Sequence, residues 1–473
     1  MRRWEDAGGV ATPLRGAYSI RQVSAWGRES DASAVVRAGA DAAASAAPAD
    51  TGATPGPRAI AATRAGPSGD LVAAEPSPEG RGGWYPAGVW ARALGVYGIV
   101  LAVLLVVSWQ VVARYTEHAP GVPPVEVSGR WFWDGWVRYD AGWYTLIADD
   151  GYAYRPGHQS SVAFFPGYPS VVRAVSGLVG NTPLAGIVVT IACGAAALVV
   201  YHGWCRARLG PQAAWAALLC LALYPYAFYL YGAVYAETLF LLCALVAFAA
   251  FERDHLALAG LAGAAASATR LVGLAVAIGL VVGVAERRGV LRGAGGRRWR
   301  ERLDLSGLRP RDAWVLLAFT GFAGWALFLW YRYGDPLLFS RVQDAWGQGS
   351  GLHTWLKRDF LASVAGIRGD RLFAYGLWAH AAVALAVVLS VPGVGRRFGV
   401  RYGVYVGVVV GIPLVGSQDF HAMGRYVLVA FPTFALLGAF IADRPALRRV
   451  VLPLSAVALV ALTVGFANGR YVS

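Results

Sequence analysis

The sequence predicts an all-α protein that crosses a membrane many times. Hydrophobic residues make up 57% of the 473-residue chain and charged residues only 15%, whereas a soluble domain is about half apolar and about one quarter charged. Stretches such as 95–108 and 271–285 contain no charged residue, which is typical of helices inside a bilayer. A soluble core cannot absorb this apolar excess. We therefore expect a polytopic bundle of about 11 transmembrane helices, with a large first extracytoplasmic loop that carries short interfacial helices.

The first predicted domain is the N-terminal tail, residues 1–91. It is rich in Ala, Gly, Pro, Ser and Arg, shows no apolar periodicity, and carries nine Arg against nine acidic residues. This composition predicts a disordered cytoplasmic tail and excludes a polybasic anchor. The tail also lacks a long apolar run that could act as a signal peptide. Residues 92–473 then form the transmembrane domain.

Eleven apolar segments follow the tail, of which the fifth and sixth are short. Their predicted limits are 93–113, 183–204, 212–230, 234–252, 256–270, 271–286, 313–332, 372–393, 400–417, 424–442 and 449–468.

Arginine-rich segments predict the orientation in the membrane. The segment 286–311 holds nine Arg against three acidic residues, and loops with excess positive charge stay cytoplasmic. Two short spans, in place of one long helix over 256–286, keep this segment on the cytoplasmic side. The same topology keeps a second set of arginines there: Arg396, Arg397, Arg401, Arg444, Arg448 and Arg449. The loops 114–182 and 333–371 and the C-terminus then lie outside a bacterial cell membrane.

The charge and cysteine content exclude other classes. The net charge of +14 could suggest nucleic-acid binding, but its distribution is explained by membrane orientation, so no nucleic-acid partner is expected. The four cysteines lie in or beside apolar spans without metal-ligand spacing. They are expected to be small buried hydrophobic side chains and not a disulfide framework.

The first outer loop contains the stretch RYDAGWYTLIADDGY at 138–152. Its tryptophan and tyrosine residues suit a membrane–water interface. The run from Asp140 to Ala148 can form a short amphipathic helix, and a second helix is expected to start near Pro169, since proline suits the first helical turn.

Several charged residues fall at predicted outer helix ends or loops and are candidates to line one site: Asp140, Asp149, Asp150, Glu237, Arg270, Asp335 and Arg425. Glu237, Arg270 and Arg425 adjoin apolar spans, where a charge is costly and usually functional. Glu237 and Arg270 could also merely pair with each other.

Simpler roles remain open for the other candidates. Asp140 could cap the short helix, since Asp accepts hydrogen bonds from free backbone N–H groups. Asp149 and Asp150 could form a solvated helix end. Asp335 lies in Gly-Asp-Pro, which is typical of a turn. His421 has no second His or Cys nearby, so no metal motif is predicted.

An ordered set of motifs resembles the PIG-V-like mannosyltransferases, which are GT-C glycosyltransferases. Asp140-Ala-Gly-Trp143-Tyr144, with Ile147-Ala148 and Gly151-Tyr152, resembles the signature WDxxWYxxIAxxGY. The later blocks are Ala163-Phe-Phe-Pro166-Gly-Tyr168-Pro169, Tyr235-Ala-Glu237-Thr-Leu-Phe240, Thr269-Arg270 with Gly273, Tyr333-Gly-Asp335-Pro336 with Phe339, and Arg425-Tyr426 with Phe431-Pro432. Tyr139 stands where the family usually has Trp, and Thr238 where it has Ser. The resemblance covers about residues 93–470.

The resemblance implies a GT-C-like bundle whose first outer loop carries an acidic catalytic residue. Such enzymes transfer a sugar, here mannose, from a polyprenyl-phosphate carrier to an extracytoplasmic lipid, glycan or protein acceptor. Asp140 is then the expected general base, and Arg270 and Arg425 are expected to bind the phosphate. Further candidates for substrate binding are Trp143, Tyr144, Asp149, Asp150, Tyr235, Glu237, Asp335 and Tyr426. No cofactor is required, although Asp149 or Asp150 could hold a divalent cation.

The alternative function is a transporter or flippase of lipid-linked sugars. It would share many spans and charges within the membrane, but transporters often contain repeated halves with broken helices. The sequence contains no internal repeat, and the long structured first loop favours an enzyme.

The orientation can be tested by cysteine labelling in intact cells. An introduced cysteine at Gly295 should be protected from a membrane-impermeant thiol reagent, because the arginine excess holds its loop in the cytoplasm. A cysteine at Gly157, in the 114–182 loop, should react. Labelling at Gly295 from outside would overturn the topology.

Overall fold

A computed structural model describes residues 87–115, 131–290, 305–346, 348, 354, 356–365, 371–417, 419–470 and 472. These residues form helices and connecting turns, without a β-strand. The all-α prediction is confirmed. The first helix begins at Ala87, inside the predicted tail; residues 1–86 of the predicted tail lie outside the described residues.

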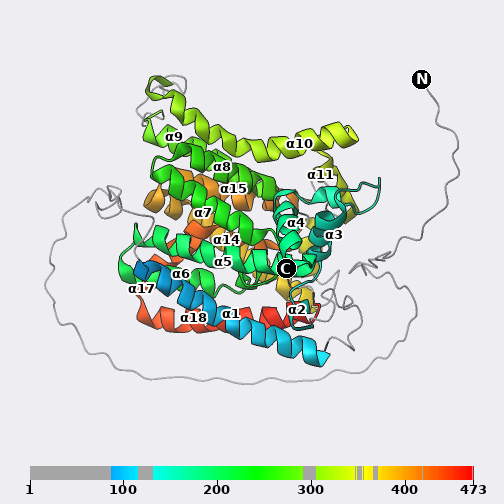
Figure 1. Ribbon diagram of the computed structural model, residues 1–473. Helices are drawn as coiled ribbons and strands as arrows, with labels where there is room; N and C mark the ends of the chain where they lie inside the picture. Colours follow the sequence, from blue (N-terminus) through cyan, green and yellow to red (C-terminus); the bar gives the residue numbers. More distant parts are fainter. Residues whose placement is uncertain are drawn as a thin grey trace, which may run out of the picture. The chain divides into compact units, whose positions relative to one another are not determined.

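The α-helices follow one another along the chain, with 3-10 helices between them, of which Pro310–Phe319 is ten residues long (Figure 1). Their limits are α1 Ala87–Tyr115, α2 Trp131–Asp134, α3 Asp140–Asp150, α4 Gly167–Val179, α5 Thr182–Arg206, α6 Pro211–Ala222, α7 Glu237–Glu252, α8 Leu256–Thr269, α9 Leu274–Arg287, α10 Thr320–Tyr333, α11 Leu338–Arg341, α13 Arg358–Val364, α14 Arg371–Phe398, α15 Val400–Gly416, α16 Met423–Val427, α17 Phe431–Ala442 and α18 Pro445–Ala467.

Five helical segments within the described residues are long and apolar enough to cross a membrane by themselves. They are Gly88–Arg114, Thr182–Arg206, Pro310–Tyr333, Gly376–Phe398 and Pro445–Ala467. Each lies within or overlaps a predicted span, which confirms the polytopic class. The other predicted spans correspond to shorter helices. As predicted, the chain breaks between α8 and α9, where Arg270 is extended with φ −159° and ψ 153°.

Two predicted spans are wrong as continuous helices. The span 212–230 is helical only to Ala222, and a 3-10 turn follows at Ala227–Leu230. The span 424–442 is divided into α16 and α17. A proline lies at each break: Pro225 follows α6, and Pro432 occupies the first turn of α17. Proline lacks the N–H that a helix interior needs and disfavours helical geometry in the preceding residue.

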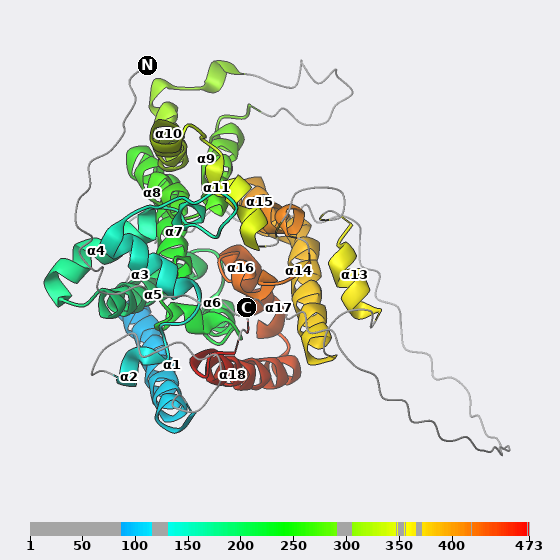
Figure 2. The ribbon, with the colours of Figure 1, turned by 90° about the vertical axis from the view of Figure 1, so that its right-hand side faces the viewer.

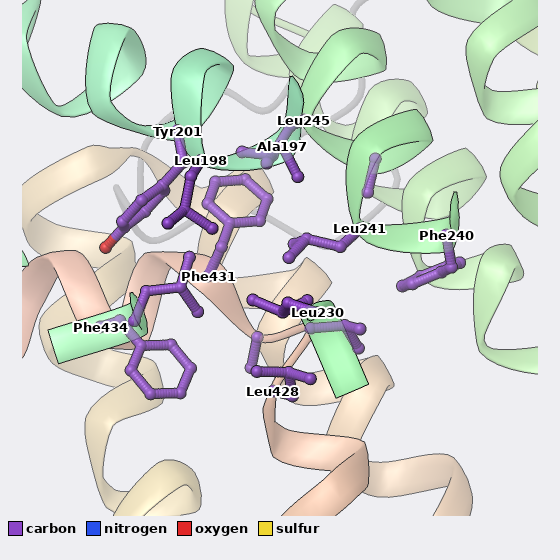
Figure 3. Close-up of a cluster of buried hydrophobic side chains, with 14 of the residues drawn as sticks. Ala197, Leu198, Tyr201, Leu230, Phe240, Leu241, Leu245, Leu428, Phe431 and Phe434 are labelled. Atoms are coloured by element: carbon purple, nitrogen blue, oxygen red, sulfur yellow. The ribbon is translucent and has the colours of Figure 1, made fainter. Parts of the chain in front are cut away.

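The main hydrophobic core joins segments that lie far apart in the sequence. Figure 3 shows Ala197, Leu198 and Tyr201 of α5 facing Leu241 and Leu245 of α7, and the same cluster includes Phe431 and Phe434 of α17. At Gly438 of α17 an added Cβ would lie 2.3 Å from the Cα of Ala217 on α6. Glycine is therefore required there for the two helices to pack closely.

A second, smaller core orders the segment between α3 and α4. Val162 and Phe165, which follow α3, pack with Trp325 and Leu329 of α10 and with α11. The Tyr333 hydroxyl also donates to the Tyr152 carbonyl at 3.1 Å. The predicted second helix is present as α4, and it begins at Gly167, two residues before Pro169. These contacts fix α3 and α4 at one end of the bundle (Figure 1).

Helix α7 connects two charged clusters at opposite ends of the bundle. Its 16 residues begin at Glu237 and end at Glu252, which corresponds to a length of roughly 24 Å. At the Glu252 end, this carboxylate pairs with Arg208 and lies 3.2 Å from Arg401, and the Tyr402 hydroxyl donates to it at 2.6 Å. We call this set the Arg208–Glu252 network. Because the length of α7 approaches the hydrocarbon thickness of a bilayer, about 30 Å, the two clusters suit its two surfaces.

The Arg208–Glu252 network should contribute strongly to stability. Removing one partner of a buried ion pair costs about 3–5 kcal/mol. Since Arg208 and Arg401 retain 20% and 22% exposure of their side chains, we expect Glu252→Gln to cost the lower part of that range in thermal unfolding. The control is Asp254→Asn at the same end: its carboxylate is 44% exposed and pairs with Arg287 and Arg311, so the loss should stay below about 1 kcal/mol. Equal effects of the two variants would contradict this assignment.

Candidate functional site at one end of the bundle

Four of the charged residues singled out in the sequence come together in the structure. Asp140 is the first residue of α3, Glu237 is the first residue of α7, Arg270 follows the last residue of α8, and Arg425 lies in α16. We call these residues the charged cluster. Their helices are separated by up to 285 positions in the sequence, yet the helix ends meet at the bundle end that carries α3. Figure 2 shows α16 there, between α7 and α14.

Arg425 occupies the centre of the charged cluster. Its Nη1 donates to Asp140 Oδ2 at 2.9 Å, and its Nε lies 3.3 Å from Glu237 Oε1. Arg270 pairs with the same Glu237 oxygen. Two carboxylates thus face two guanidinium groups, and their formal charges cancel. Pairing of this kind is what allows charges to exist in a low-dielectric interior.

The four side chains differ in their access to solvent. Glu237 is 1% exposed and Arg425 7%, whereas Arg270 and Asp140 are 15% and 24% exposed. Glu237 and Arg425 therefore form the buried base of the charged cluster. Asp140 and Arg270 form its accessible rim, where a ligand from the membrane surface could reach them.

The start of α3 is fixed by the backbone around Asp140. Tyr139 has a positive φ of 55°, which is uncommon for a residue other than glycine. The Asp140 N–H donates to the Tyr235 hydroxyl at 3.2 Å, and that hydroxyl donates to the Arg138 carbonyl at 3.2 Å. The capping residue is Tyr139, without a side-chain cap hydrogen bond. The simpler role of Asp140 as a helix cap is therefore wrong, because its carboxylate bonds Arg425 instead.

Aromatic rings surround the two arginines. The guanidinium of Arg425 lies 5.2 Å from the Tyr235 ring and 5.3 Å from the Tyr426 ring, and Arg270 lies 5.2 Å from Tyr426. These distances permit cation–π attraction. Tyr144 is also close to the charged cluster. Burial raises the pKa of its hydroxyl, and the Glu237 carboxylate adds to the rise. Tyr144 therefore remains a neutral hydrogen-bonding group at physiological pH.

Other predicted site residues lie elsewhere. Trp143 stacks on Phe164 at a centroid distance of 5.8 Å and contacts Trp346, so it belongs to an aromatic group beside the site. Asp335 accepts from the Leu337 N–H at 3.0 Å and pairs with Arg341, which confirms the turn and not a place in the charged cluster.

Asp149 and Asp150 are exposed at the far end of α3. That end is about 15 Å along the helix from Asp140. Asp149 accepts from the Thr182 hydroxyl at 2.5 Å. Across the described part of the chain, no three or more His, Cys, Asp and Glu side chains are grouped to hold a metal ion.

The sequence interpretation missed residues that border Arg425. The guanidinium of Arg425 lies 5.8 Å from the Tyr229 ring. His380, in the middle of an apolar span, accepts a hydrogen bond from the backbone N–H of Gly424 at 3.0 Å. His380 meets the same criterion as Glu237, because a polar side chain within a membrane span usually has a role.

Comparisons with solved structures give only distant matches. One is ArnT from Cupriavidus metallidurans bound to undecaprenyl phosphate, with 16% identity and a TM-score of 0.42 over 79% of this chain and 71% of that one. Another is the Archaeoglobus fulgidus oligosaccharyltransferase in complex with zinc and sulfate, with 13% identity and a TM-score of 0.39 over 79% of this chain and 53% of that one. The chain thus spans about half the length of that enzyme. No family model matches, and no curated protein sequence matches. A proposal about function must therefore be argued from the residues of this chain.

The charged cluster makes a prediction about the ranking of two variants. Glu237→Gln removes two ionic contacts and leaves Arg270 without its carboxylate, whereas Arg270→Gln leaves Glu237 paired with Arg425. We expect Glu237→Gln to lower the free energy of unfolding by about 3–5 kcal/mol and Arg270→Gln to lower it by less. Thermal unfolding of the purified protein in detergent measures both.

The exposed pair Arg341–Asp335 supplies the control. Arg341 is 74% exposed, so Arg341→Gln should change stability by less than about 1 kcal/mol. If Arg270→Gln proves more costly than Glu237→Gln, Glu237 is not the shared anion of the charged cluster.

Proposed function

We propose that the protein is a membrane glycosyltransferase that takes a sugar from a polyprenyl-phosphate carrier at the outer membrane surface. The observation that carries the proposal is the convergence of an accessible carboxylate and two arginines at one end of a bundle of membrane-spanning helices. Arginine binds phosphate through paired N–H groups, and a carboxylate beside it can accept a proton. The motif resemblance to PIG-V-like mannosyltransferases supports mannose as the transferred sugar.

In the proposed reaction Asp140 is the general base. An acceptor hydroxyl attacks the anomeric carbon of the sugar, its proton passes to Asp140, and the bond from that carbon to the carrier phosphate breaks. A single displacement of this kind inverts the anomeric centre. Arg425 occupies only Oδ2 of Asp140. A carboxylate has about four acceptor positions, so Oδ1 is available for the acceptor hydroxyl.

Arg270 and Arg425 stabilise the departing phosphate. The reaction leaves negative charge on the carrier, and two guanidinium groups held in place stabilise that charge without reorganisation. Tyr426 is partly exposed beside both arginines and offers an aromatic face against which a sugar ring can pack. Tyr144 and Tyr235 are buried and support the site from behind. The donor partner is a lipid-linked sugar, and the acceptor is an extracytoplasmic lipid, glycan or protein.

The distribution of charge supports the proposed placement on the outer surface. The Arg208–Glu252 network and the start of α15 lie at the opposite end of α7 from the charged cluster. The arginine-rich segment 286–311 begins in the last turn of α9, where Glu286 pairs with Arg401 of the same network. By the positive-inside rule that end faces the cytoplasm, which leaves the charged cluster on the extracytoplasmic side.

The decisive variant is Asp140→Asn. The amide can still accept a hydrogen bond from Arg425, but it cannot take the proton of the acceptor, and general-base catalysis is worth about 10²–10⁴-fold in rate. We expect transfer of labelled mannose from polyprenyl-phosphate mannose to fall at least about a hundredfold, with thermal stability and binding of polyprenyl phosphate retained.

Two matched variants control for the loss of a carboxylate in the same helix. Asp149→Asn and Asp150→Asn, made separately, should transfer sugar at close to the wild-type rate, because both residues lie at the far end of α3. Near wild-type transfer by Asp140→Asn would refute its role as base. If the wild-type protein moves the lipid-linked sugar across vesicle membranes without transferring the sugar, a flippase is favoured instead.

A further inference from the structure

The position of the Arg425 guanidinium is determined by an unusual backbone segment. Arg425 lies in the short helix α16, and the residue before that helix, Ala422, has a positive φ of 63°. Alanine adopts this conformation rarely, and it persists only where the surrounding structure holds it. The contacts that hold it are therefore contacts that place Arg425.

Both peptide groups of Gly424, the residue directly before Arg425, are bonded by side chains from other elements. The Gly424 N–H donates to Nδ1 of His380 at 3.0 Å, and the Gly424 carbonyl accepts from the Tyr224 hydroxyl at 2.9 Å. Both hydrogen bonds are buried. A buried backbone group that loses its partner is costly. These two bonds therefore fix the peptide groups on both sides of the Gly424 Cα, and the second of these peptide groups leads into Arg425.

Tyr226 contacts both Gly424 and His380. A Cβ at position 424 would lie 2.2 Å from the Tyr226 ring, so the backbone of Gly424 rests directly on that ring. His380 Nδ1 accepts a hydrogen bond and therefore carries no proton, which places the proton of the neutral imidazole on Nε2. Nε2 then donates to the Tyr226 hydroxyl at 3.3 Å.

We propose that His380 is a positioning residue: by holding the backbone at Gly424 it sets the Arg425 guanidinium between Asp140 and Glu237. His380 lies on α14 and is 5% exposed. A polar imidazole is costly within an apolar span, so a histidine at such a position usually has a role. The contacts made by its ring nitrogens go to Gly424 and Tyr226. Its effect on ligand binding should therefore pass through Arg425.

The proposal rests on the proposed function, in that polyprenyl phosphate is the ligand of Arg425. His380→Leu should weaken binding of polyprenyl phosphate by the purified full-length protein about tenfold, since it leaves the Gly424 N–H without its acceptor. His380→Asn should restore near wild-type binding, because the amide oxygen can take the place of Nδ1. The dephosphorylated polyprenol, which lacks the group that Arg425 binds, should be bound equally by all variants.

A double-mutant cycle separates positioning from general packing. If His380 acts through Arg425, His380→Leu should weaken binding by no more than about twofold in an Arg425→Gln background, since the group that it positions is gone. The control is His202→Leu, which removes another buried histidine, on α5 near the Arg208–Glu252 network; it should leave binding unchanged. Should His380→Leu fail to fold, Tyr224→Phe removes only the bond to the Gly424 carbonyl and takes its place.

The outcomes separate the two proposals. Wild-type protein that does not bind polyprenyl phosphate overturns the proposed function. The positioning role is then decided by thermal unfolding of the same cycle, where coupling between His380 and Arg425 supports it and strict additivity refutes it. If the wild type binds and Arg425→Gln weakens binding, but His380→Leu binds like wild type or acts additively, His380 is a packing residue and the inference is wrong.

Discussion

The ionic contacts of Arg425 are the interaction on which the bundle end that carries α3 depends. A guanidinium that is 7% exposed requires nearby carboxylates, because an unpaired charge in an apolar interior is far too costly to persist. Asp140 and Glu237 supply them from α3 and α7. Each carboxylate is the first residue of its helix, where the partial positive charge of the N-terminus also favours an anion. The fold therefore brings helix ends, and not helix middles, to this point.

The same requirement explains several irregular features of the backbone. Helix α8 stops at Thr269, so that Arg270 can adopt an extended conformation and reach Glu237. Tyr139 and Ala422 take positive φ angles directly before the segments that carry Asp140 and Arg425. Strained backbone of this kind concentrates at functional sites. Tyr139 and Ala422 lie directly beside the charged cluster, although Asp254, close to the Arg208–Glu252 network, also has a positive φ of 64°.

Much of this arrangement could be predicted from the sequence because charge beside apolar spans is conspicuous. Asp140, Glu237, Arg270 and Arg425 were found in this way, and the structure brings them together. Asp149, Asp150 and Asp335 carry the same kind of charge but lie in solvated or turn positions, which local sequence does not distinguish from a site. The breaks in the spans 212–230 and 424–442 were missed because apolar content continues across them.

His380 shows a second limit of sequence reasoning. A neutral histidine adds nothing to a charge count, so a search for charges beside apolar spans passes over His380, although it contacts the segment that carries Arg425. Its partner is a backbone N–H, and sequence patterns carry no information about which backbone groups are left free by a break in a helix. Only the observed fold reveals that Gly424 needs bonds from α14 and from the segment after α6.

The differences in burial within the charged cluster suggest how the proposed reaction would begin. Glu237 is buried and contacts both arginines, so its ion pair with Arg425 is harder to break than the ion pair between Asp140 and Arg425. Asp140 is the more exposed partner, and its contact with Arg425 is the one that an arriving phosphate would replace. A phosphate that takes over Nη1 of Arg425 would release Oδ2 of Asp140, which could then accept a hydrogen bond from the acceptor hydroxyl. Donor binding and release of the Asp140 carboxylate for the acceptor would thus be a single exchange of partners on Arg425.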